Sequence, residues 1–387
     1  MLGFATFAAL LPELRDLWGL SNAEAGMVAS AFFAGYVTTV SYWTALTDRM
    51  DGRRVYLTGA LLATAGGIGF GLAADGLASG MLFHALLGAG VAGTYMPGLR
   101  LLSDRTSGPS QSRFIAFYTS FFGIGTAISL ALAGVLAPAW GWRSAFVVSA
   151  AGPLLAGVWV FFFIQGSRKN SKTPFSFATL FPLASWRKVI ADRAAAGYTL
   201  GYVAHCIELF GSRGWMVAFL AYSAGLQAAG DAFPWNFAAI AAVVNLLAVP
   251  ASIFGNEIAL RIGRRQWIQI AMVGSGACGV ALAFSGALHW SIVVLLLIVY
   301  SMLVMAESAT LTAGLVAAAP AELRGAALGL YSLAGFSGGM IGPSLFGLAL
   351  DLGGGKQSIH SWAWGYAAIG AGCLAAPLVV RLFRQAR

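Results

Sequence analysis

The sequence predicts an all-α, polytopic membrane protein with twelve transmembrane helices arranged in two six-helix bundles. Hydrophobic residues make up 59% of the 387 positions and charged residues only 10%, whereas a soluble domain carries charge on about a quarter of its residues. So few charges cannot cover a water-facing surface. The 50 glycines agree with this interpretation, because small residues let transmembrane helices approach closely.

Apolar segments of spanning length recur along the chain. A bilayer core about 30 Å thick requires about 20 apolar residues per helix. The segments that meet this requirement are 26–46, 54–74, 77–102, 113–136, 143–164, 194–222, 234–256, 266–287, 290–314, 325–349 and 361–380.

The first twenty residues predict one more helix, apparently truncated. Met1–Leu11 is apolar but too short to cross, and Pro12 and the polar turn Glu13–Asp16 follow it. The segment has neither the basic region nor the cleavage site of a signal peptide, so we do not interpret it as one. We therefore interpret this segment as the far end of a first helix and expect apolar residues upstream of it.

The basic residues predict the orientation in the membrane. With Arg15 placed outside, 19 of the 23 Lys and Arg residues fall in alternate loops, and only Arg15, Arg143, Arg213 and Lys356 lie elsewhere. This asymmetry follows the positive-inside rule. We expect both termini to be cytoplasmic, in a bacterial-type inner membrane. The net charge of +9 therefore reflects topology and not a nucleic-acid surface.

A central basic segment divides the chain. Residues 165–193 form the longest polar interruption, with an apolar part at Phe175–Trp186 that we expect to lie at the interface as an amphipathic helix. The domains are therefore predicted as 1–164, a cytoplasmic linker 165–193, and 194–387. Similar basic loops follow the second span of each half, which is typical of transporter repeats.

Short motifs in these loops match a known family. Asp48-Arg49 and Gly52-Arg53-Arg54 fit the pattern G-x-L-x-D-R-x-G-R-R, with one additional residue between them and Thr44 at the usual glycine. Trp142-Arg143 and Glu322-Leu323-Arg324-Gly325 open the sixth and eleventh spans. With twelve spans and a central basic loop, the sequence resembles the major facilitator superfamily over essentially its whole length.

The resemblance implies a secondary transporter that works by alternating access, without a cofactor and as a monomer. It also implies that charged residues of the two matched loops lock the cytoplasmic ends of the halves in one conformation. These gate residues are Asp48, Arg49, Gly52, Arg53, Arg54, Arg261, Gly263, Arg264 and Arg265. The alternative is that the basic ones only set the topology.

Two departures from the family bear on the substrate. His84 stands where span 4 often has an arginine linked to proton coupling, and span 5 lacks the Gly-Pro signature of many drug antiporters. These features favour a small organic or inorganic anion, as in the cyanate-, nitrate- and nitrite-type porters, over a drug. A drug substrate stays an alternative.

Ionisable residues inside spans are the candidates for coupling and substrate binding. We expect such residues to line a cavity or to form a pair with another polar group, because an ionisable side chain that faces lipid is costly. Glu208 and His205 share one face of span 7, and Glu307 lies in span 10. We expect Glu208 or Glu307 to take up a proton that His205 or His84 shares. Alternatively, Glu208 forms a structural pair with His205 or Arg213.

Arg213 lies near the outer end of span 7. It either attracts an anion or extends toward the interface.

Other functions are less consistent with the sequence. Gly88–Gly93 satisfies the dinucleotide pattern G-x-G-x-x-G, but it lies mid-span, which indicates helix packing. In a membrane-embedded metal enzyme His205 and Glu208 would be metal ligands, but the sequence has no third ligand at motif spacing. A copper(I) transporter using Met302 and Met305 with His205 and Cys206 is a further alternative. We expect no metal and no enzyme activity, and a small solute, protons and lipid as partners.

Overall fold

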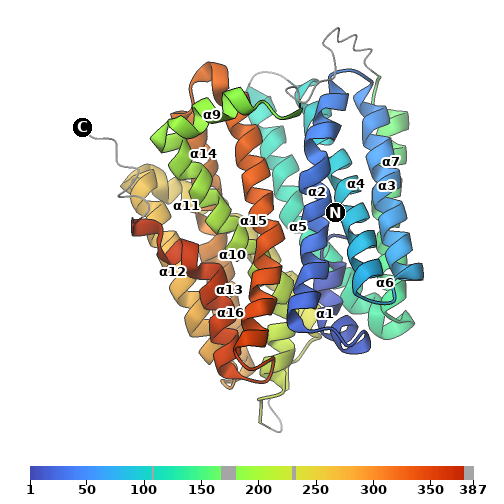
Figure 1. Ribbon diagram of the computed structural model, residues 1–387, viewed down its shortest axis with the longest axis vertical. Coiled ribbons are helices and arrows are strands. Elements are labelled where there is room, and N and C mark those ends of the chain that lie inside the picture. Colours follow the sequence, from blue (N-terminus) through green and yellow to red (C-terminus); the bar gives the residue numbers. More distant parts are fainter. Residues whose placement is uncertain (107–108, 167–179, 229–231, 379–387) are drawn as a thin grey trace. The chain divides into compact units, whose positions relative to one another are not determined.

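The computed structural model describes residues 1–106, 109–166, 180–228 and 232–378. These residues form helices joined by short turns, and no β-strand occurs among them (Figure 1). The expected all-α class is therefore confirmed. Eight helices in the described part are long and apolar enough to cross a membrane, and the protein is an integral membrane protein.

The helices follow the predicted spans closely in the first half of the chain. Their bounds are α1 Thr6–Leu17, α2 Asn22–Thr47, α3 Gly52–Ala73, α4 Leu77–Ser103, α5 Pro109–Trp140, α6 Trp142–Ser149 and α7 Ala151–Phe163. The expected sixth span is thus divided at Ala150 into α6 and α7. Pro12 does not end the first helix, because α1 continues through it to Leu17; proline is tolerated in membrane helices where neighbouring groups satisfy the freed carbonyl.

The second half begins with a short helix in the linker. The bounds are α9 Leu183–Ala191, α10 Arg193–Ala224, α11 Phe237–Ile262, α12 Arg264–Phe284, α13 Trp290–Ala306, α14 Ser308–Ala318, a 3₁₀ turn Ala321–Leu323, α15 Arg324–Leu352 and α16 Ile359–Leu374. Of the amphipathic helix expected at Phe175–Trp186, residues 175–179 lie outside the described residues. The expected tenth span is divided at Glu307.

Side-chain caps begin the helices that carry the candidate residues. Asp192 accepts a hydrogen bond from the Ala195 amide (2.8 Å) at the start of α10, and Asn236 accepts one from the Ala239 amide (2.7 Å) at the start of α11. Such caps satisfy amides that have no partner inside the helix. The sequence thereby sets where α10 begins and which residues of it lie at mid-span.

The chain divides into two compact units. One holds Met1–Leu10 and Ala31–Phe181, and the other holds Leu11–Ser30 and Pro182–Arg387. Both boundaries in the N-terminal region fall inside helices, α1 and α2. The bundles 1–164 and 194–387 stay a prediction.

Glycines hold helices together within each unit. In the first unit, Gly88 of α4 meets the Phe32 carbonyl of α2 so closely that an added Cβ would overlap it, and Gly90 meets Ala63 of α3 in the same way. These contacts confirm that the G-x-G-x-x-G segment serves helix packing. In the second unit, Gly255 of α11 lies against the backbone of Ala306 in α13, immediately before the break at Glu307.

Candidate functional site

Glu307 lies at a discontinuity between two helices of the second unit. The helix α13 ends at Ala306 and α14 begins at Ser308. The indole of Trp267 in α12 donates a hydrogen bond to the Ala306 carbonyl (3.0 Å), which holds the end of α13. The Glu307 side chain is fully buried, with 0% exposure. The break therefore places a carboxyl group inside the unit and away from lipid.

His205 is the direct partner of Glu307. Its Nδ1 lies 3.1 Å from the Glu307 Oε1, and both side chains are buried. The Tyr202 ring stacks on the imidazole at a centroid distance of 5.7 Å and on the Tyr331 ring at 3.8 Å. The aromatic stack fixes the imidazole plane, so one ring nitrogen is held against the carboxylate. The expected sharing of a proton between His205 and a carboxyl group stays a prediction, and Glu307 is the carboxyl within reach of His205.

Glu208 is hydrogen-bonded to α12 through one of its two oxygens. The Ser275 hydroxyl lies 2.7 Å from the Glu208 Oε2 and also 3.0 Å from the Met272 carbonyl. A hydroxyl has one proton to donate, so it cannot serve both acceptors fully. If Glu208 is protonated, its own O–H donates to Ser275 and the hydroxyl proton goes to Met272. The protonated carboxyl thus satisfies this arrangement better than the carboxylate does.

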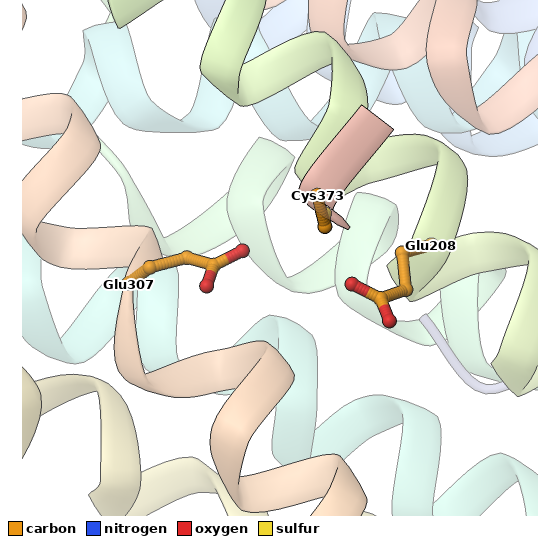
Figure 2. Close-up of side chains that lie close together, drawn as sticks. All are labelled: Glu208, Glu307 and Cys373. Carbon is orange, nitrogen blue, oxygen red and sulfur yellow. The ribbon is translucent and has the colours of Figure 1, made fainter. Parts of the chain in front are cut away.

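The two carboxyl groups face each other beside a thiol. A ligand atom from each of Glu208, Glu307 and Cys373 lies within 4.8 Å of the others, and Figure 2 shows the carboxyl groups pointing toward one another with Cys373 next to them. The Oε1 of Glu208 and the Oε2 of Glu307 have no hydrogen-bond partner. Two ionised carboxylates at this separation repel strongly in a poorly polarisable interior.

These atoms do not form a coordination shell. Carboxylate, thiol and imidazole are groups that zinc accepts, with bonds of about 2.0–2.3 Å, and they would stand about 3.3–3.7 Å apart around one tetrahedral ion. The separations here extend to 4.8 Å. The hydrogen bonds recorded for the two carboxyl groups go to His205 and Ser275.

The thioether ligands expected for copper(I) are not assembled. Met302 is 39% exposed, and the Met305 Sδ lies 3.4 Å from the Nη2 of Arg213. A sulfur that accepts a hydrogen bond from a guanidinium is poorly placed to bind another cation. The Nδ1 of His205 is hydrogen-bonded to Glu307.

His84 belongs to the first unit, whereas Arg213 belongs to the second unit and follows the cluster residues of α10. His84 is a buried residue of the first unit, with the rings of Phe7, Phe32 and Phe70 at centroid distances of 5.5, 5.6 and 5.8 Å. Arg213 lies on α10, five residues beyond Glu208, and its guanidinium contacts Met305 of α13. The structure thus brings His205, Glu208 and Glu307 together and places Arg213 beside them on the same helix.

The N-terminal gate residues form ion pairs within the first unit. Asp48 pairs with Arg100 of α4 (3.4 Å). Arg53 donates to Asp51 (2.8 and 2.9 Å) and to the Ile164 carbonyl at the end of α7 (2.9 Å). Gly52 packs against Leu101.

In the second unit, the gate residues lie around the turn between α11 and α12. Arg261 lies in the last turn of α11, Gly263 has a φ of 98°, a conformation that favours glycine, and Arg264 begins α12. Arg265 follows in the first turn of α12.

Sequence reasoning did not identify Ser275 and Cys373 as site residues. Cys373 is a buried free thiol in an apolar segment, and nothing in that segment indicates that it faces Glu208. Ser275 stands between Gly274 and Gly276. A small polar residue between glycines on a transmembrane helix is a signal for a close polar contact.

Comparison with known families decides the class of protein. The model of the Major Facilitator Superfamily matches residues 1–343. The chain belongs to this family. The two relatives described next are named as transporters. The resemblance inferred from the loop motifs is confirmed.

Two bacterial relatives indicate the range of similarity. The chain is 26% identical over 141 residues to the niacin transporter NiaP of Acinetobacter baylyi, covering 36% of this chain and 32% of that protein. It is 27% identical over 166 residues to the 4-hydroxybenzoate transporter PcaK of the same organism, covering 42% and 35%. The matched segments therefore span about a third of these relatives' lengths.

A solved structure supports the fold of this major facilitator protein over nearly its full length. A bacterial homolog of the human lysosomal transporter Spinster, in an inward-facing and unoccupied conformation, superposes with a TM-score of 0.74. The match covers 99% of this chain and 92% of that one at 14% identity. At such low identity the likeness shows the fold alone.

Proposed function

We propose that this protein is a secondary active transporter that moves a small organic acid across a bacterial-type inner membrane by alternating access, coupled to protons. The observation that carries the proposal is the buried pair of facing carboxyl groups, Glu208 and Glu307, with the imidazole of His205 3.1 Å from the Glu307 carboxyl group. The named substrates of the relatives, niacin and 4-hydroxybenzoate, are both carboxylic acids.

The cluster has the properties of a proton-binding site. Charged groups inside a membrane span are costly and mark ion pathways. One proton on Glu208 removes the repulsion from Glu307 and completes the hydrogen bonds of Ser275. The remaining charge on Glu307 is then balanced by a protonated His205 at 3.1 Å. One added proton thus removes the repulsion between the two carboxyl groups and lets Ser275 hydrogen-bond to both Glu208 and Met272.

Several further groups face Glu208 and enter this balance. They come from α10, α12, α13 and α16 and from the break after α13; they are His205, Ser275, Cys278, Tyr300, Glu307 and Cys373. Among them only Glu307 and His205 have ordinary pKa values below neutral pH. The proton count of the cluster therefore depends on these two residues and Glu208.

The gate loops supply the conformational part of the proposal. The exposed Asp48–Arg100 pair is of a kind that contributes about 0–1 kcal/mol, so it can break and re-form at low cost during a transport cycle. We propose that these residues and the matching loop Arg261–Arg265 stabilise one conformation, with both termini on the cytoplasmic side.

Transport by the reconstituted protein tests the proposed function. Proteoliposomes are loaded at neutral pH, and the uptake of radiolabelled 4-hydroxybenzoate and niacin is measured with an acidic or a neutral exterior. We expect accumulation above equilibrium only with the acidic exterior, and its loss on addition of a protonophore. Accumulation that is equal with and without the pH gradient would contradict proton coupling.

A further inference from the structure

Arg213 is a cation whose hydrogen-bonding capacity is almost unused. A guanidinium offers five N–H donors. The one contact recorded for it is from Nη2 to the Met305 Sδ at 3.4 Å, and a thioether is a weak acceptor. Among the described residues no carboxylate lies within ion-pair distance of Arg213. The side chain keeps partial exposure, as does Met305, although Trp215 two residues further is completely buried.

Other arginines of the chain are better satisfied. Arg15 donates to the Asn22 Oδ1 at 2.8 Å, Arg53 donates to a carboxylate and two carbonyls, and Arg100 donates to Asp104 at 3.0 Å. Each of these lies near a helix end, and Arg15 has its oxygen acceptor although it is only 6% exposed. Arg213 lies inside α10, within a membrane span, so the absence of an oxygen acceptor is costly there.

The surroundings of Arg213 on α10 are apolar and partly aromatic. Phe210 lies one turn before it on the same helix face and stacks with Phe336 of α15 at 6.0 Å and 23°. Met216 lies one turn after it, and its Sδ accepts a hydrogen bond from the Asn245 Nδ2 at 3.8 Å. Arg213 therefore has an aromatic side chain one turn before it on α10 and two thioethers near it, those of Met305 and Met216.

The other ionisable groups of the second unit's interior restrict the charge of such a ligand. Glu208 precedes Arg213 by five residues, and Glu307 follows Met305 by two. Whenever either group is ionised, it repels a second carboxylate. A monocarboxylate with an apolar, planar body satisfies the cation without placing another negative charge near the acidic cluster.

We propose that Arg213 binds the carboxylate of the transported substrate, and that the substrates are small planar monocarboxylates whose rings pack toward Phe210. This inference rests on the proposed function in that it names the substrate class of the same transporter. Arginine is suited to the role, since its planar fork binds a carboxylate through two parallel hydrogen bonds.

Equilibrium binding without a membrane gradient tests this assignment. Purified full-length protein in detergent is titrated with 4-hydroxybenzoate, nicotinate and benzoate, each paired with its neutral amide. We expect the wild type to bind at least one acid and to bind its amide about 10- to 100-fold more weakly, the effect of losing a hydrogen bond to a charged group. We expect Arg213→Met to bind the acid more weakly than the wild type does, by the same factor, and to bind the amide with unchanged affinity.

Three variants keep the test decisive. Arg213→Lys retains the charge but not the fork, so its affinity for the acid should be intermediate, and it reports on the site if Arg213→Met fails to fold. Met305→Leu removes only the thioether and should bind the acid within about twofold of wild type. Arg143→Met, at an exposed arginine of the first unit that stacks on Trp142, controls for the loss of one positive charge.

The outcomes separate this proposal from the proposed function. Equal binding of acid and amide by the wild type, wild-type affinity for the acid in Arg213→Met, or no binding of any acid would each overturn the carboxylate assignment. Proton coupling does not enter the binding measurement. A protein that binds acids through Arg213 but shows no gradient-driven uptake would instead contradict the proposed coupling.

Discussion

The imidazole Nδ1 of His205 lies 3.1 Å from the Oε1 of Glu307, although the two residues are 102 positions apart in the chain. The contact joins the middle of α10 to the break between α13 and α14. It places a titratable base against one of two facing carboxyl groups in a region without lipid or water contact. The first two predictions below follow from this relationship.

Glu208→Gln should separate proton coupling from substrate movement. Glutamine imitates the protonated carboxyl, because its amide donates to Ser275 where the acid O–H would. We expect pH-driven accumulation to be lost and substrate counterflow to be retained in the same proteoliposome preparation. If Glu208 is only structural, thermal stability and expression fall while residual transport keeps its pH dependence. Unchanged pH-driven accumulation would move the coupling role to Glu307.

The His205–Glu307 pair should show strong energetic coupling. His205→Ala leaves the carboxyl group of Glu307 buried without its partner, and breaking a buried pair costs about 3–5 kcal/mol. The second change, Glu307→Gln, removes the uncompensated charge, so the double variant should be more stable than His205→Ala alone. Melting temperatures in detergent for the two single variants and the double variant measure this. Additive losses would mean that the two side chains do not interact.

Packing at Gly255 should control the position of the Glu307 break. A Cβ at Gly255 overlaps the backbone of Ala306, and overpacking of this kind costs about 1–3 kcal/mol. We expect Gly255→Ala to lower the melting temperature and to weaken pH-driven uptake. Gly329→Ala is the matched control, because Gly329 is a helical glycine of α15 with open space around it. Equal melting temperatures of the two variants would exclude a tight contact at Gly255.

The charge asymmetry of the loops predicts which side each loop occupies. In a variant lacking Cys206, Cys278 and Cys373, a cysteine at Arg187 in α9 should react with an impermeant maleimide only from the cytoplasmic side. A cysteine at Lys356, between α15 and α16, should react only from outside. Labelling of intact cells and of inverted vesicles measures both. Reaction of Arg187→Cys in intact cells would reverse the proposed orientation.

The sequence alone was sufficient for the class, the family and most helix bounds. These depend on local properties, namely the length of apolar runs, caps such as Asp192 at the start of α10, and basic loops between spans. The same-face placement of His205 and Glu208 also followed from helical periodicity, because residues three apart on one helix share a face.

Contacts between helices were decided only by the tertiary structure. Periodicity indicates which face of α12 or α16 is polar or small, but not which residue of another helix it meets, so Ser275 and Cys373 could not be assigned to Glu208. The breaks at Ala150 and Glu307 also depend on neighbours, such as the Trp267 indole that holds the Ala306 carbonyl. A break leaves carbonyls without partners inside their own helix, and only a second helix can supply the donors, which is why no local pattern predicts where it occurs.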